Sequence, residues 1–192
     1  MPHPAVLRQV STELSTTRLL LRCPREGDGV LVHEAVVESL NELRAWPASL
    51  PWALEEPSVA ASEAYCRESA AAFIKRSSLV YLAFDHDGRL VASTSLHSIN
   101  WNVPKFEVGF WCRSSLTGRG YIKEAIAELI RYAFESLAAQ RVDALPDEEN
   151  TASRAVCESL GMSLEGVLRN ERITPQGSLR STCVYAAARS GA

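Results

Sequence analysis

Apolar residues recur at helical spacing in four stretches of the chain. The clearest pattern covers residues 121–137, where apolar side chains return every three or four positions, and it predicts the longest helix. Residues 151–161 show a shorter version of the same pattern. Two further helices are predicted over residues 27–46 and residues 58–75, the second with the side chain of Ser58 capping its start.

Shorter segments that are rich in branched and aromatic residues predict strands. In residues 106–111 apolar and other side chains alternate, so that Glu107, Gly109 and Trp111 would share one face of a sheet. Asp87-Gly88 is a strong hairpin signal between two such segments. The remaining predicted strands cover residues 18–22, 79–84, 89–99, 141–145, 162–170 and 178–188.

The order of these elements predicts an α/β (α+β) fold. Hairpins come early, strands and helices then alternate, and two strands close the chain. This order favours a three-layer domain with a mixed sheet over a doubly wound parallel sheet. At this length we expect one domain over residues 1–192, with residues 1–15 forming a loose N-terminal segment.

Composition and charge narrow the classes of function. The net charge is -3, and no run of Lys or Arg is longer than a pair, which argues against nucleic-acid binding. No apolar run reaches the length of a membrane span and no signal peptide is evident, so we expect a cytoplasmic protein without membrane contact. The five cysteines are scattered without metal-binding spacing, so no metal site is predicted.

The stretch SLTGRGYIKEA, residues 115–125, offers the first candidate chemistry. It connects a predicted strand to the longest helix, and its two glycines let backbone approach a ligand closely. Unpaired N–H groups and the helix dipole favour an anion at such a helix start. The P-loop pattern is missing, and Lys123 stands where GxGxxG requires its third glycine. An anion site and a simple structural turn both explain the stretch at this point.

Several segments in one order resemble the GNAT superfamily of acetyl-CoA-dependent N-acetyltransferases. They are EVGFWCRSSLTGRGYIKEAI, ENTASRAVCESLGMSLEGVLR and VYAAA. The earlier segments TTRLLLRCPREGD and NELRAWPASLPWA are similar to the RimJ/RimL branch, whose enzymes acetylate the N-terminal amine of ribosomal proteins. The resemblance covers nearly the whole chain, and it is the combination that is specific.

The resemblance implies a GNAT-like fold in which a mixed, mostly antiparallel sheet splays to admit coenzyme A, with helices on both faces. The pyrophosphate-loop pattern of the family falls on residues 117–122, where Gly120 matches and Thr117 and Ile122 depart. Pantetheine would lie beside the strand of Glu107, with a bulge near Cys112 and Arg113. The implied acetyl-CoA-binding residues are Trp111, Cys112, Arg113, Thr117, Gly118, Arg119, Gly120, Tyr121, Ile122, Asn150 and Ser153.

Acetyl transfer to an amine requires a neutral amine, a polarised thioester carbonyl and a proton for the leaving thiolate. Glu107 is the first candidate for the base, and a salt-bridged strand carboxylate is its structural alternative. Glu171 is the second candidate, although an exposed residue near a turn is the simpler interpretation. Asn150 and Ser153 match a pattern of this branch, in which Asn150 would hold the cofactor and Ser153 protonate the thiolate. Helix capping explains the same pair.

The acceptor side is predicted from loop residues that would overhang the site. They are Trp46, Trp52, Trp101 and Asn102, although loop tryptophans also pack as lids against a core. The histidines His33, His86 and His97 are interpreted as structural.

The sequence therefore predicts an acetyl-CoA-dependent N-acetyltransferase with direct transfer in a ternary complex and no metal. The acceptor would be an N-terminal amine of a ribosomal or other protein, or a small-molecule amine. The alternative is a non-catalytic acyl-CoA-binding or protein-interaction module of the same fold. Homodimers are common in the resembling family, but no feature of this sequence demands one.

Overall fold

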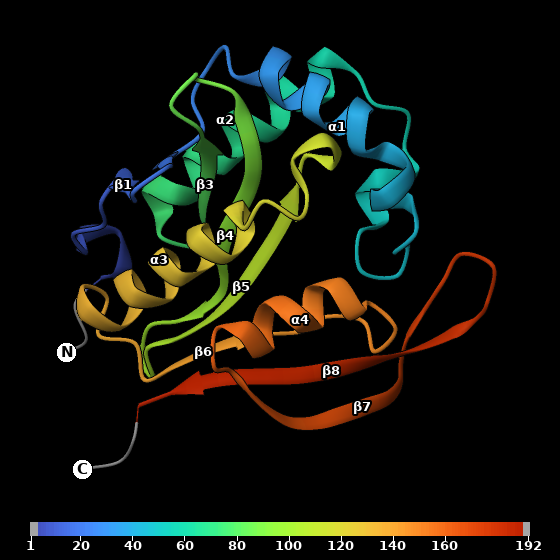
Figure 1. The fold of residues 1–192 in the computed structure, drawn as a ribbon. Helices are drawn as coiled ribbons and strands as arrows, with labels where there is room; N and C mark the ends of the chain where they lie inside the picture. Colours follow the sequence, from blue (N-terminus) through green and yellow to red (C-terminus); the bar gives the residue numbers. More distant parts are fainter. Residues whose placement is uncertain (1–3, 190–192) are drawn as a thin grey trace.

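The computed structural model describes residues 4–189, in which a single sheet of eight strands forms the centre of the molecule (Figure 1). The strand order is β1-β2-β3-β4-β5-β6-β8-β7, and all neighbouring strands are antiparallel except β5 and β6. The strands are β1 (Glu13–Ser15), β2 (Leu20–Arg22), β3 (Leu79–Phe84), β4 (Leu90–Asn100), β5 (Lys105–Cys112), β6 (Arg141–Ala144), β7 (Ser163–Ile173) and β8 (Leu179–Ala188).

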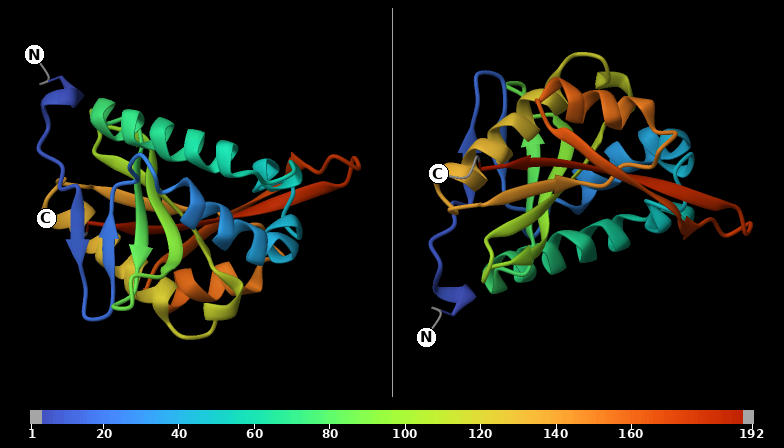
Figure 2. Two further views of the ribbon diagram at one scale, coloured as in Figure 1. Left: turned by 90° about the horizontal axis from the view of Figure 1, so that it is seen from above. Right: turned by 90° about the horizontal axis from the view of Figure 1, so that it is seen from below.

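Helices cover both faces of this sheet, with α2 on one side and α3 and α4 on the other (Figure 2). The helices are α1 (Gly29–Arg44), α2 (Val59–Lys75), α3 (Tyr121–Glu135) and α4 (Thr151–Ser159), with short 3-10 helices η1 (Ala5–Leu7), η2 (Pro51–Leu54) and η3 (Ser114–Leu116). The mixed, mostly antiparallel sheet between helical layers confirms the predicted fold class.

Two apolar cores hold the layers together. The larger core joins the apolar face of α3, including Leu129 and Ala133, to Phe106 and Val108 of β5. The smaller core joins α1 and α2 to β3 and β4, and Val36 and Leu82 are among its members. The helical repeat of α3 and the alternation of β5 therefore place on one face the apolar residues that form the larger core.

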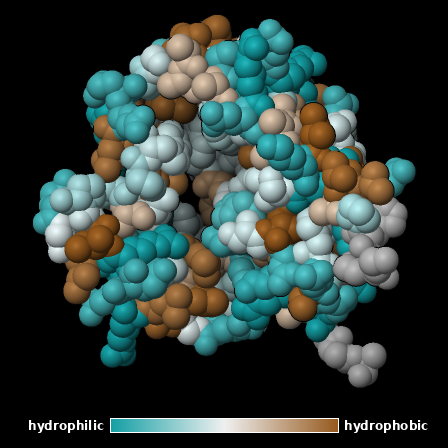
Figure 3. All heavy atoms as spheres, turned by 180° about the vertical axis from the view of Figure 1, so that it is seen from behind, coloured by the Kyte–Doolittle hydropathy of each residue, from teal (hydrophilic) through white to brown (hydrophobic). Residues whose placement is uncertain are grey.

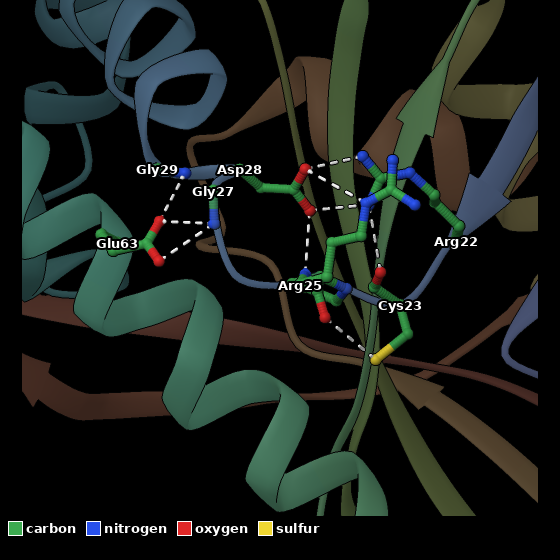
Figure 4. Close-up of polar contacts among 8 residues, drawn as sticks. Arg22, Cys23, Arg25, Gly27, Asp28, Gly29 and Glu63 are labelled. Carbon is green, nitrogen blue, oxygen red and sulfur yellow. Dashed lines mark hydrogen bonds and ion pairs between the residues drawn. The ribbon is translucent and has the colours of Figure 1, made fainter.

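A buried ion pair fixes the start of α1 (Figure 4). Arg22 of β2 donates to both carboxylate oxygens of Asp28, over 2.6 and 2.7 Å. The carboxylate of Glu63 on α2 accepts hydrogen bonds from the N–H groups of Gly27 and Gly29, each over 3.0 Å. The first N–H groups of a helix have no partner within the helix, and Glu63 supplies one at the start of α1. A Cβ at Gly29 would lie 2.7 Å from the Cα of Glu63, so the two helices touch at this glycine.

The parallel strands β5 and β6 separate along their length. They pair only from Lys105 to Glu107, opposite Arg141 to Asp143, and then diverge, as the directions of β5 and β6 in Figure 1 show. Beyond Glu107 the edge of β5 has no strand partner on this side within the described residues. Because buried backbone polar groups require partners, a partly open strand edge of this kind suits an extended ligand.

The prediction of a loose segment over residues 1–15 is wrong for part of its described portion. Glu13–Ser15 forms β1 and pairs with β2. Just before β1, the N–H of Ser11 donates to the hydroxyl of Tyr132 and its carbonyl accepts from Tyr81, both over 2.7 Å. These long-range bonds with the hydroxyls of two buried tyrosines order the segment, and no local sequence pattern predicts them. Residues 1–3 lie outside the described residues.

The predicted bulge near Cys112 and Arg113 is also wrong. The pairing of β4 with β5 keeps one register up to Cys112, and the N–H of Arg113 then donates to the Val91 carbonyl over 2.9 Å. The irregularity lies between His97 and Asn100, next to the hairpin turn that joins the two strands.

Candidate functional site

The glycine stretch forms a loop of exposed backbone donors before α3. Gly118 and Gly120 have φ angles of 74° and 78°, in the left-handed region that favours glycine. Among residues 4–189, no group accepts a hydrogen bond from the backbone N–H groups of residues 118–123. A Cβ added at Gly118 would meet no atom within 4 Å. The loop thus presents a row of N–H groups at the positive end of a helix, which is the geometry of an anion cradle.

Arg18, between β1 and β2, contacts both the loop and the first turn of α3. Its Nη1 donates to the Arg119 carbonyl over 3.0 Å, and its Nε lies 2.6 Å from Oε2 of Glu124. The guanidinium also lies 4.7 Å from the centre of the Tyr121 ring. Burial raises the pKa of Glu124, but hydrogen bonds from Thr16 and Arg18 outweigh this and hold it below its usual range. No local pattern of the sequence points to Arg18, which lies about a hundred residues from the loop.

A second anchor holds the beginning of the loop against α1. Glu38 of α1 accepts from the N–H of Ser115 over 3.0 Å, and Nε of Arg113 lies 2.6 Å from its Oε2. The hydrogen bonds from Ser115, followed by the contact with Arg113, lower the pKa of Glu38 to about 2. Arg113 was predicted to bind the cofactor, but its side chain does not line the cavity beside the loop.

The loop borders a cavity of about 450 Å³, which we call the loop cavity. It brings together most of the residues predicted to bind the cofactor, namely Trp111, Cys112, Thr117, Gly118, Gly120, Tyr121, Ile122, Asn150 and Ser153. Trp46, predicted on the acceptor side, also lies here. Lys123 is a lining residue that the sequence analysis did not assign to the site, and Arg119 does not line the cavity.

Asn150 caps α4, as its alternative interpretation anticipated. Its Oδ1 accepts from the N–H of Ser153 over 3.0 Å, and both residues face the loop cavity. Thr117 turns its hydroxyl back to the Ser114 carbonyl over 2.9 Å, so its donor is already used within the loop. Burial raises the pKa of the Cys112 thiol to about 11, which keeps this lining residue neutral near pH 7.

A second cavity of about 680 Å³, the helix cavity, lies between α1, η2, α2 and strands β4 and β5. Its lining includes Trp52, Tyr65, Glu68, Ser93 and His97. The helix cavity and the loop cavity share three lining residues, which are Leu50, Phe110 and Trp111. The face turned away from the viewer in Figure 1 is hollowed near its middle (Figure 3).

Glu107 lies beside the helix cavity without lining it. Its Oε1 is 3.9 Å from Nε2 of His97, the residue opposite it on β4, and His97 does line the cavity. The Glu107 side chain is 21% exposed. The carboxylate predicted as the base is thus separated from the cavity by an imidazole that the sequence analysis interpreted as structural.

Three other predicted residues lie elsewhere. Trp101 and Asn102 form the β4–β5 turn, where the indole N–H donates to the Arg76 carbonyl over 2.9 Å and the ring packs on Phe106. Glu171 accepts from the Thr182 hydroxyl over 2.8 Å on the β7–β8 hairpin. The structure brings none of these side chains to either cavity.

Two kinds of feature are missing from residues 4–189. No helix in this range is both long enough and apolar enough to span a bilayer. No three His, Cys, Asp or Glu side chains in the same range are grouped so that they could hold a metal ion.

Comparison with known proteins agrees with this geometry. The family model described as the acetyltransferase (GNAT) domain matches residues 18–163. The chain is 39% identical over 85 residues to the putative ribosomal N-acetyltransferase YdaF of Bacillus subtilis, a match that covers 44% of this chain and 46% of that protein. The matched segment therefore spans about half the length of this curated relative.

Solved structures share the fold over nearly the whole chain. One titled as a probable acetyltransferase superposes with a TM-score of 0.83 at 24% identity, covering 92% of this chain and 97% of its own. RimL, a ribosomal alpha-N-protein acetyltransferase in complex with coenzyme A, superposes with a TM-score of 0.81 at 20% identity, covering 90% of this chain and 95% of its own.

Proposed function

Since this chain belongs to the acetyltransferase (GNAT) family, we propose that it is an N-acetyltransferase that transfers an acetyl group from acetyl-CoA to a primary amine. Transfer would be direct, with both substrates bound at once. One observation carries the proposal: the loop cavity and the helix cavity meet at Leu50, Phe110 and Trp111. A thioester in one cavity and an amine in the other would come into contact at this junction.

The loop cavity suits coenzyme A. The free N–H groups of residues 118–123 match the oxygens of a pyrophosphate, and the space beside Gly118 leaves room for it. The unpaired edge of β5 beyond Glu107 suits the two amides of pantetheine, which would continue the ladder that β6 leaves. Lys123 lines the same cavity and is exposed, so its ammonium would add charge for a phosphate.

The helix cavity suits a positively charged acceptor. Glu55, Glu56 and Glu68 line it, and no Lys or Arg side chain belongs to its described lining. Arg44 lies 3.0 Å from Glu56 and offsets one of these charges. The lining therefore favours a ligand that arrives as an ammonium ion. A protein N-terminal amine, with a pKa of ~7.7–8.0, is roughly a tenth neutral at pH 7, so it needs only modest help to react.

We propose a protein N-terminus, of a ribosomal or another protein, as the first acceptor class to test, and a small-molecule amine as the second. The likeness to proteins titled as ribosomal acetyltransferases motivates this order. Asn150 and Ser153 border the cofactor side of the junction, where the Ser153 hydroxyl would supply a proton to the departing thiolate. The cytoplasmic location expected from the sequence stays a prediction, and the homodimer stays a possibility that only the family resemblance suggests.

A thiol-release assay with acetyl-CoA tests the proposal. The purified chain would be incubated with a panel of peptides that differ in their first residue and with small mono- and polyamines. Parallel calorimetry would measure coenzyme A binding without turnover. We expect tight binding together with thiol release for at least one acceptor. Tight binding without release for any amine would instead favour a non-catalytic acyl-CoA-binding module.

A further inference from the structure

We propose that His97 is the catalytic base that takes a proton from the acceptor amine, and that Glu107 is the residue that positions it. This inference rests on the proposed function. It replaces Glu107 as the base, because His97 and not Glu107 lines the helix cavity.

The imidazole lies between polar groups of both strands. His97 on β4 lies opposite Glu107 on β5, with Nε2 of His97 3.9 Å from Oε1 of Glu107, and its Nδ1 lies 3.1 Å from the Ser98 hydroxyl. At this distance the Glu107 carboxylate makes no hydrogen bond to the ring, but it attracts the imidazolium that forms when Nε2 takes up a proton. The His97 side chain is 36% exposed, so a ligand in the cavity can reach it.

Gly109 makes room for this ring. A Cβ at position 109 would lie 2.9 Å from Nε2 of His97 and 3.1 Å from the Ser95 hydroxyl, so no other residue type fits while the imidazole stays in place. The backbone of Gly109 is not left-handed, so glycine is not required there by conformation. The close approach of the imidazole is a physical reason for a glycine at this position. Gly109 lines the helix cavity together with His97, and it lies two residues before Trp111, which lines both cavities.

The surroundings suit proton transfer from an ammonium ion. The titratable groups that line the same cavity are Glu55, Glu56 and Glu68, and Tyr65 of α2, whose hydroxyl lies 3.1 Å from that of Ser93. With Glu107, these carboxylates attract both an incoming ammonium ion and the imidazolium that forms from His97. An imidazole nitrogen can accept a proton from an ammonium ion and pass it to water, which suits a general base.

The transfer step conserves atoms and charge. Nε2 of His97 accepts a proton from the acceptor ammonium, and the freed nitrogen lone pair forms a C–N bond to the acetyl carbon as the C–S bond breaks. The nitrogen then loses a second proton, and the thiolate gains one to become the free thiol. The imidazolium returns its proton to water, so one proton is released for each ammonium ion acetylated.

The test compares His97→Gln with His86→Gln, a matched substitution of an exposed histidine whose only described hydrogen bond is to the Thr17 carbonyl. We expect His97→Gln to lower kcat about 100-fold near pH 7, the lower end of general-base effects. The deficit should shrink as pH rises past the pKa of the acceptor amine, and it should be smaller for an acceptor of lower pKa. Coenzyme A affinity, measured by calorimetry, should change less than about twofold.

Glu107→Gln tests the positioning role. A positioning residue acts through His97, so Glu107→Gln should lower kcat in the wild-type background and have little further effect in the His97→Gln background. A merely structural Glu107 would lower the rate by the same factor in both backgrounds.

The outcomes separate the two proposals. Equal kcat and equal pH profiles for wild type and His97→Gln, with an active wild type, would overturn the role of His97 and leave the proposed function standing. A deficit that is constant with pH would make His97 structural and also overturn its role. A wild type that binds coenzyme A but acetylates no amine would overturn both proposals.

Discussion

Substituting Gly118 by Ala tests whether the glycine loop holds a pyrophosphate, and Gly88→Ala provides a matched control. The two glycines have φ angles of 74° and 76°, and a Cβ at either would meet no atom within 4 Å. Gly88 lies in the β3–β4 hairpin turn, away from both cavities, whereas Gly118 lines the loop cavity. The substitutions therefore have the same local effect on backbone and differ only in their distance from the ligand.

The expected loss of stability is small and equal for both variants. Alanine in the left-handed region costs about 1–2 kcal/mol. Restriction of the unfolded chain offsets about 0.4–1 kcal/mol of this. A net loss of about 1 kcal/mol would lower Tm by roughly 2–4 °C in a protein of this size.

The effect on ligand binding should separate the variants. The methyl group added by Gly118→Ala would occupy the space beside the free N–H groups of the loop and push a pyrophosphate oxygen away from them. Losing one hydrogen bond to a charged group costs about 1.5–3 kcal/mol. Because about 1.4 kcal/mol is tenfold in an equilibrium constant, Kd for coenzyme A should rise about tenfold or more in Gly118→Ala and stay unchanged in Gly88→Ala.

Isothermal calorimetry with coenzyme A measures this difference, and pantetheine, which carries no phosphate, serves as the second probe. Gly118→Ala should weaken coenzyme A and leave pantetheine binding unaltered. Equal coenzyme A affinities in Gly118→Ala and Gly88→Ala would refute the argument, because the loop would then be a structural turn alone.

Three further substitutions test contacts that support the site. Asp28→Ala should reduce the free energy of unfolding in urea by about 3 kcal/mol, because it leaves the Arg22 guanidinium buried without its carboxylate, and a loss below about 1 kcal/mol would contradict this. Because the pKa of Glu38 is lowered in the folded protein, its contribution to stability is present above about pH 4.5 and disappears as pH falls toward about 2. The difference in Tm between wild type and Glu38→Gln should therefore shrink over that range, and a constant difference would contradict this. Arg18→Met removes the donor to the Arg119 carbonyl and should raise Kd for coenzyme A several-fold in calorimetry, whereas unchanged affinity would show that the loop needs no support from behind.

The elements that the sequence predicted well have a local physical cause. In α3 and β5 one face is buried, and the residues of that face recur at a fixed spacing along the chain. This spacing can be read directly from neighbouring residues of the sequence. The cap of α2 is equally local, since the Ser58 hydroxyl accepts from an N–H three residues later, over 3.1 Å. The glycine loop could be located for the same reason, because its left-handed backbone depends on its own two glycines.

The misplaced acceptor residues show where local patterns fail. Trp101 and Asn102 lie at the turn where β4 ends and β5 begins, whereas the two cavities meet at the other end of β5, near Trp111. The place of a loop in the sequence does not by itself show at which end of the sheet the loop lies. The direction of β5 shows it here, because the turn before β5 lies at the start of this strand and cannot reach over its other end.

Arg18 and Glu38 were missed for a related reason. Each acts on the loop from a distant part of the chain, Arg18 through the Arg119 carbonyl and Glu38 through the Ser115 N–H. The loop groups named here are backbone atoms, which carry no residue-type signal, and the ion pairs with Glu124 and Arg113 join residues far apart in the sequence. Contacts of this kind become visible only when the chain has folded.

Glycines in this site have two different physical roles that the sequence cannot distinguish. Gly118 and Gly120 have a left-handed backbone that favours glycine, and the loop N–H groups beside them have no acceptor among residues 4–189 and would form the proposed anion cradle. Gly109 has an ordinary strand backbone and leaves space for the His97 ring, because a Cβ there would lie 2.9 Å from its Nε2. The first role can be inferred from a helix that follows two glycines. The second depends on the cross-strand register between β4 and β5, which places His97 beside Gly109 at the wall of the helix cavity.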